Sequence, residues 1–116
     1  MEEICAMEFI QVQITFPTME SAKNVAKLLV ERRLAACVQI VGKIRSEYIW
    51  NDEVENNDEI LLLAKTRLVF FDEIIDFVRG LHPYVCPQII ALPIIAANDD
   101  YIQWMNDQLK KSIQKT

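Results

Sequence analysis

One short segment of the chain carries side chains that could bind a metal ion. The segment HPYVCP at residues 82–87 contains the only histidine and one of the three cysteines. Imidazole nitrogen and thiolate sulfur suit copper and zinc, and the two prolines restrict the backbone that would hold them. His82 and Cys86 alone make a weak site, although symmetry between copies could multiply the ligands. The alternative is structural: His82 caps the preceding helix or hydrogen-bonds locally, and Cys86 is a small buried apolar residue.

A glutamate and a lysine could orient a ligand. Glu59 and Lys65 are six residues apart in a strand-like run, so they share one face with Leu61 and Leu63. A charge at each end of an apolar stripe could orient a ligand in a cleft between chains. The alternative is that the two residues form a partly buried ion pair or contact solvent at the strand ends. The acidic run at residues 51–58 lacks the spacing of a calcium loop, and we interpret it as a solvated hairpin tip.

The sequence contains no motif of a known catalytic class. It lacks a P-loop, G-x-G-x-x-G, H-E-x-x-H, G-x-S-x-G and a C-x-x-C pair, and no serine is placed to pair with His82. An acylphosphatase would need an arginine in the loop after the first strand, but residues 17–20 read PTME. We therefore expect a protein that is not an enzyme and that requires no cofactor.

Hydrophobic periodicity predicts the elements that position these residues. Alternating or continuous apolar runs predict strands, and apolar residues at helical spacing predict helices. The predicted strands are residues 9–16, 34–41, 44–50, 59–66 and 88–95, with a bend or bulge at residues 42–43. The predicted helices are residues 18–33 with Thr18 as N-cap, residues 67–81, and a last helix that begins near Asn98. This order predicts an α+β, ferredoxin-like βαββαβ antiparallel sheet with two helices on one face, plus a C-terminal helix.

The second face of that sheet predicts an oligomer. Residues 59–66 place Leu62 on one face and Leu61 and Leu63 on the other, and residues 89–92 are apolar without a break. Strands of this kind are usually covered on both sides, whereas one helix layer covers only one. A second chain would cover the rest, including Tyr48 and Trp50. The alternative is a monomer in which the last helix covers the second face.

Composition limits the partners and the compartment. The 116 residues suffice for one domain, which we place at residues 8–116 after a flexible tail at residues 1–7. The net charge of −5 argues against nucleic acid and against an anionic membrane surface, and no apolar run is long enough to span a bilayer. Three cysteines without a paired spacing fit a reducing compartment, so we expect a cytoplasmic protein.

Several separated motifs resemble those of the CutA (divalent-cation tolerance) family. They are LAACVQI at residues 34–40, Tyr48 with Trp50, Glu59 with Lys65 and Thr66, HPYxxP at residues 82–87, and Tyr101 with Trp104. The resemblance covers about residues 8–110. It implies a ferredoxin-like protomer in a tight homotrimer, whose neighbouring chains extend one another's sheets.

The resemblance also implies positions for a copper site. Ligands proposed in a bacterial member correspond to Ile14, Leu81 and His82, and only His82 can bind a metal. Cys86 could replace one lost ligand, which is our own hypothesis. The first hypothesis is thus a cytoplasmic homotrimer that responds to divalent metal ions, with copper or zinc at His82 and Cys86. The second is a small-molecule-binding signalling trimer, in which Tyr48, Trp50, Glu59, Lys65, His82 and Tyr84 line clefts between subunits.

Overall fold

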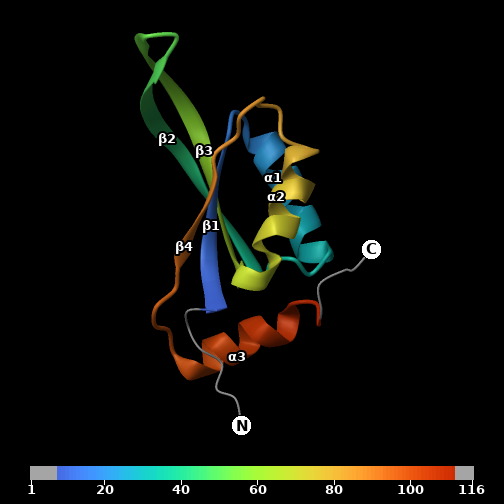
Figure 1. Cartoon of the computed structure of the whole chain (residues 1–116). Helices are drawn as coiled ribbons and strands as arrows, with labels where there is room; N and C mark the ends of the chain where they lie inside the picture. Colours follow the sequence, from blue (N-terminus) through green and yellow to red (C-terminus); the bar gives the residue numbers. More distant parts are fainter. Residues whose placement is uncertain (1–7, 112–116) are drawn as a thin grey trace.

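The protein is built on a four-stranded antiparallel sheet, with two helices on one face and a third helix at one end (Figure 1). The computed structural model describes residues 8–111. The strands are β1 (Phe9–Phe16), β2 (Cys37–Trp50), β3 (Glu53–Arg67) and β4 (Ile89–Pro93), in the order β2-β3-β1-β4. The helices are α1 (Met19–Glu31), the 3-10 turn η2 (Leu68–Phe70), α2 (Phe71–Arg79) and α3 (Asp99–Gln108). The α+β fold is therefore confirmed, whereas the proposed tail at residues 1–7 lies outside the described residues.

The core lies between the sheet and the two helices α1 and α2. Val12, Ile14 and Phe16 alternate along β1 and are fully buried. Helix α1 begins as expected, because the Thr18 side chain accepts a hydrogen bond from the backbone N–H of Ser21 at 3.1 Å. The buried residues of the two helices belong to the same core cluster as these β1 side chains. They are Ala22, Val25 and Leu29 on α1 and Ile74 and Val78 on α2.

The hairpin of β2 and β3 differs from the expected one. Residues 51–58 are all exposed, which confirms the predicted solvated hairpin tip, but only Asn51 and Asp52 form the turn and residues 53–58 belong to β3. Asn51 and Asp52 have φ angles of 53° and 64°, and two left-handed residues match the twist of a tight hairpin. A shift in register between Val41 and Lys43 confirms the predicted bulge. Beyond β1, the hairpin continues as a two-stranded arm at residues 43–58 (Figure 1).

Strand β2 begins three residues later than predicted. The backbone N–H groups of Leu34 and Ala35 donate to the carbonyl of Leu29, at 3.0 and 3.2 Å, and so they close the end of α1. Arg33 takes a left-handed φ of 57° at this point, which is common where a helix ends. The apolar run at residues 34–36 therefore belongs to a buried helix terminus.

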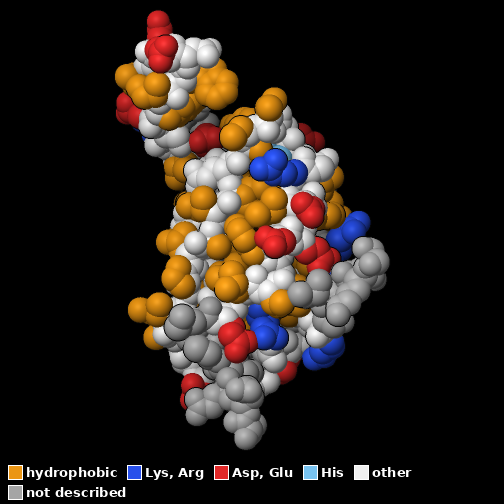
Figure 2. Space-filling view, viewed as in Figure 1, with side chains coloured by type: hydrophobic (Ala, Val, Ile, Leu, Met, Phe, Trp, Pro, Cys, Tyr) orange, Lys and Arg blue, Asp and Glu red, His pale blue; other side chains and the backbone are white. Residues whose placement is uncertain are grey.

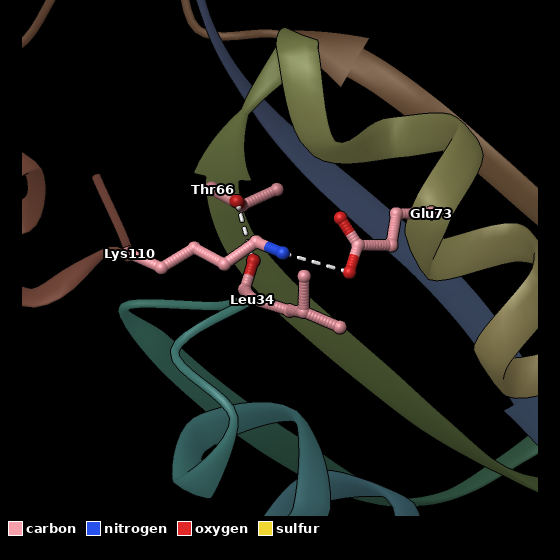
Figure 3. Close-up of polar contacts among 4 residues, drawn as sticks. All are labelled: Leu34, Thr66, Glu73 and Lys110. Atoms are coloured by element: carbon pink, nitrogen blue, oxygen red, sulfur yellow. Dashed lines mark hydrogen bonds and ion pairs between the residues drawn. The ribbon is translucent and has the colours of Figure 1, made fainter. Parts of the chain in front are cut away.

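Helix α3 lies across the end of the sheet at which β1 begins (Figure 1). It buries Ile102 and Met105, and the residue after its end, Leu109, is buried as well. The Lys110 ammonium lies 2.8 Å from the Glu73 carboxylate of α2, beside the hydroxyl that Thr66 donates to the Leu34 carbonyl (Figure 3). Helix α3 packs against this end of the sheet and leaves much of the second face uncovered. Ile90 and Leu92 on that face are still 46% and 41% exposed in the single chain. The alternative in which the last helix covers that face is wrong.

Candidate functional site

The only histidine lies against the end of β1, in the loop between α2 and β4. His82 is 9% exposed, and its ring stacks on Phe16 with 4.5 Å between the ring centroids. Its Nε2 is 2.7 Å from the Thr15 carbonyl oxygen, and its Nδ1 is 3.1 Å from the backbone nitrogen of Tyr84. A carbonyl can only accept and an amide N–H can only donate, so Nε2 carries the proton and Nδ1 accepts. Both ring nitrogens of the neutral imidazole are therefore engaged.

Burial keeps the His82 imidazole neutral. Loss of water around the ring lowers its pKa from 6.5, and the Thr15 carbonyl and the Glu59 carboxylate oppose this shift only in part. The unfolded chain thus takes up a proton near pH 6.5, whereas the folded chain does so only at lower pH. By linkage, the stability that depends on this residue is present above pH 6.5 and is lost as the pH falls.

We expect the His82 ring protons to titrate below pH 6.5 in an NMR experiment, which a single histidine makes easy to interpret. Replacing His82 by glutamine should remove part of the fall in Tm between pH 7 and pH 5, since that variant has no imidazole to protonate. Thermal melts of both proteins across this range measure the effect. An imidazole that titrates at or above 6.5 would contradict the buried, neutral state.

A buried carboxylate lies next to this histidine. Glu59 of β3 is 8% exposed, and its Oε2 accepts a hydrogen bond from the Tyr84 hydroxyl at 2.9 Å. Burial and the Glu59 carboxylate raise the pKa of Tyr84 to about 12, with a smaller contribution from Tyr48. The Tyr84 hydroxyl thus keeps its proton and donates this hydrogen bond to Glu59 throughout the physiological pH range. Among residues 8–111, Glu59 forms no ion pair.

The positions that the resemblance implies for copper do not form a copper centre as the chain is folded. Ile14 and Leu81 have no donor atom, and both nitrogens of His82 are engaged. Cys86 is exposed on the loop, next to Val85, which is 99% exposed. In the part of the chain that the structure describes, no three side chains of the His, Cys, Asp or Glu type gather where a metal could bind. A metal at His82 would have to replace one of its two hydrogen bonds.

The arm places two more of the sequence-derived residues on the face that carries Glu59. In the β2–β3 register, Tyr48 pairs with Glu55, Trp50 with Glu53 and Ile44 with Glu59, so alternation brings Tyr48 and Trp50 to that face. Tyr48 also receives a hydrogen bond from the Asn57 side chain. Trp50 is 60% exposed beside the hairpin turn.

Lys65 lies at the other end of the same face. Its ammonium donates to the side-chain oxygen of Gln39 in β2. Six residues of strand separate it from Glu59, or roughly 20 Å at about 3.3 Å per residue. The alternative of an ion pair between Glu59 and Lys65 within one chain is therefore wrong. The structure joins His82, Tyr84 and Glu59 and places Tyr48 near them. Lys65 and Trp50 lie farther along the face, and Cys86 is exposed on the loop.

Sequence reasoning missed two parts of this site. The backbone carbonyl of Thr15 accepts a hydrogen bond from the His82 ring. Every residue has a backbone carbonyl, so the residue type does not predict this contact. Phe16 was read as part of the apolar alternation of β1, yet it also provides the surface on which the imidazole stacks. The sequence does show that Phe16 is the last residue before Pro17, and so that it lies at the end of the strand.

The second face of the sheet has apolar side chains on β2, β3 and β4, beside Gln11 and Gln13 of β1, and part of it is open in the single chain. Leu61 and Leu63 are half-buried, and Val41, Ile90 and Leu92 are exposed. On the other face of the arm, Ile49 and Val54 pair with each other and are 64% and 69% exposed, and Figure 2 shows hydrophobic side chains gathered on the arm away from the body. Within residues 8–111, no helix is long and apolar enough to cross a membrane. Exposed apolar surface of this kind is typical of sites that bind a partner.

Residues 10–108 match the model of one protein family, described as CutA1 divalent ion tolerance protein. Over 96 residues the chain is 47% identical to the divalent-cation tolerance protein CutA of Thermus thermophilus, which covers 83% of this chain and 93% of that protein. It is 39% identical over 100 residues to human protein CutA, covering 86% of this chain but only 55% of the human protein. A crystal structure of CutA1 from Oryza sativa superposes with a TM-score of 0.87 at 38% identity, covering 90% of this chain and 95% of that one.

Proposed function

Because the chain belongs to the CutA1 divalent ion tolerance family, we propose that it acts in the response to divalent cations as a homotrimeric binding protein of the cytoplasm. The family match over residues 10–108 supports the link with divalent cations. Cys37 and Cys86 are both free thiols, which favours a reducing compartment. No sequence motif for catalysis is present, which favours binding over enzymatic activity.

The main observation that supports a homotrimer is the open apolar face of the sheet. Leu61, Leu63, Ile90 and Leu92 lie on the sheet face opposite α1 and α2, where Ile90 and Leu92 are still 46% and 41% exposed. The sheet also ends in two different edges, the long β2 and the five-residue β4. Pairing of one edge with the other on a neighbouring copy is a head-to-tail contact, which forms a ring where the rotation between copies closes. A ring of three copies covers each face and leaves no edge open.

The chain in solution should therefore have a mass close to three times 13.5 kDa. Size-exclusion chromatography with light scattering at micromolar concentration measures this directly, without reference to shape. We expect the same mass with and without a chelator, because the contacts that form the face are apolar. A particle of 13.5 kDa would contradict the proposal.

For the cation itself we propose His82 and Cys86 as the ligands to test first. Binding would require the loop at residues 82–87 to release the imidazole from Thr15 or from Tyr84. We expect Zn(II) or Cu(II) to perturb the His82 ring resonances at pH 7.5 and to do so less at pH 5.5, where the ring is protonated. The Cys86→Ser variant should weaken the response, whereas Cys37→Ser serves as the matched control. Ring resonances that stay unchanged with metal in excess would eliminate this site.

The engaged nitrogens of His82 favour a second candidate, a trimer that binds a small molecule between subunits. Glu59, Tyr84 and Tyr48 offer a carboxylate and two phenols on one face, and Trp50 extends that face. In a Trp104→Phe background, Trp50 fluorescence reports on that face alone. A metabolite panel that changes this signal while metals leave His82 unperturbed would favour the second candidate over the first.

A further inference from the structure

Two charged side chains on the open face, Glu59 and Lys65, form no ion pair within residues 8–111. Glu59 is 8% exposed, and its described contact is the Tyr84 hydroxyl rather than a cation. Lys65 is half-buried and donates to the Gln39 amide oxygen; among the described residues it meets no carboxylate. A buried carboxylate without a counter-charge is unfavourable, and a half-buried ammonium is stabilised by one, so a partner of opposite charge from outside residues 8–111 would stabilise both groups.

The two groups cannot satisfy each other within one chain. They lie at opposite ends of the stripe that contains Leu61 and Leu63, roughly 20 Å apart along β3. Glu59 therefore lies at one end of the exposed apolar surface, and Lys65 lies at the other. A second copy that covers this surface reaches both charges.

The asymmetry of the chain indicates how a second copy is placed. The arm extends beyond the body only at the Glu59 end, and the two sheet edges differ in length. A head-to-tail contact therefore brings the arm end of one copy to a different region of the next, and the Lys65 end carries the complementary charge. Resting on the homotrimer proposed above, we propose that Glu59 of each chain forms a buried ion pair with Lys65 of its neighbour, beside Tyr84.

Zero-length cross-linking tests the contact directly. A water-soluble carbodiimide joins a carboxylate to an amine only where the two groups touch. We expect covalent dimers and trimers on a denaturing gel, and a peptide that joins Glu59 to Lys65 by mass spectrometry. The Lys65→Arg variant keeps the charge but has no reactive amine, so it should keep its mass in solution and lose this cross-link. Lys43→Arg, whose ion pair is with Asp58 of its own arm, should retain it.

Charge reversal provides a second, independent test. Glu59→Lys and Lys65→Glu should each weaken association at least tenfold, and the double variant should recover most of it. The matched controls are Lys27→Glu and Glu31→Lys, an exposed pair on α1 whose reversal should leave association unchanged. If Glu59→Lys does not fold by circular dichroism, Glu59→Gln replaces it and should weaken association in the same direction.

The outcomes separate this inference from the proposal on which it rests. A monomeric wild-type chain would remove the trimer and the ion pair together. A trimeric wild type that cross-links through other residues, with a double variant no better than the single ones, would overturn the ion pair and leave the trimer in place.

Discussion

Replacing Leu61 by glutamate should convert the proposed trimer into a folded monomer of 13.5 kDa. Leu61 lies on the open face of β3, where it pairs with Thr15 on one side and Val41 on the other. Its neighbours in sequence, Ile60 and Leu62, point to the helix side, so the substitution leaves the core intact. In the proposed trimer the new carboxylate would have to be buried among apolar side chains, which costs several kcal/mol for each copy. An assembly of three copies would bury three such carboxylates, and the three free-energy costs would add.

Light scattering and far-ultraviolet circular dichroism measure the two parts of this result. The first should show one chain per particle, and the second an unchanged spectrum. Val30→Glu is the matched control, because Val30 is 44% exposed on α1, in the layer opposite the open face. It should leave the mass unchanged. A Leu61→Glu variant that keeps the wild-type mass would show that this face is not the interface.

The sequence predicted the fold well because each element has a strong local signal. The alternation in residues 9–16, the Thr18 cap and the helical spacing of Ile74 and Val78 all agree with the structure. The errors arose where a local preference was overridden. Residues 53–58 are polar, yet they continue β3 because backbone pairing with β2 holds them. Residues 34–36 are apolar, yet they close α1 rather than begin β2.

The site was predictable in its residues but not in its arrangement. His82 and Tyr84 stood out beside two prolines, and Glu59 stood out as a charge on an apolar stripe. Their contact depends on how the loop after α2 returns to the end of β1, which is long-range geometry. The metal interpretation of His82 followed from side-chain chemistry alone. Two hydrogen bonds to backbone groups, which sequence does not reveal, make the structural role of this ring the stronger one.

Replacing Phe16 by alanine should lower the free energy of unfolding by about 3–5 kcal/mol, the range for a fully buried phenylalanine. Phe16 is 0% exposed at the end of β1, and the His82 ring stacks on it. The substitution therefore leaves a cavity in the core and removes the surface on which the loop at residues 82–87 rests. Chemical denaturation of wild type and variant at pH 7.5, on the Leu61→Glu background if that variant is monomeric, measures the difference without a contribution from assembly.

Phe16→Leu separates the two roles of this residue. Leucine keeps most of the apolar volume, so the stability loss should be smaller, but it cannot stack on the imidazole. Water then reaches the ring more easily, and the pKa of His82 should rise toward 6.5 because burial is the main cause of its lowered value. Val85→Ala, at the 99% exposed position in the same loop, should change neither quantity. If Phe16→Leu leaves the His82 titration as it is, then the Thr15 carbonyl and the Tyr84 amide hold the imidazole by themselves, and the aromatic contact serves the core alone.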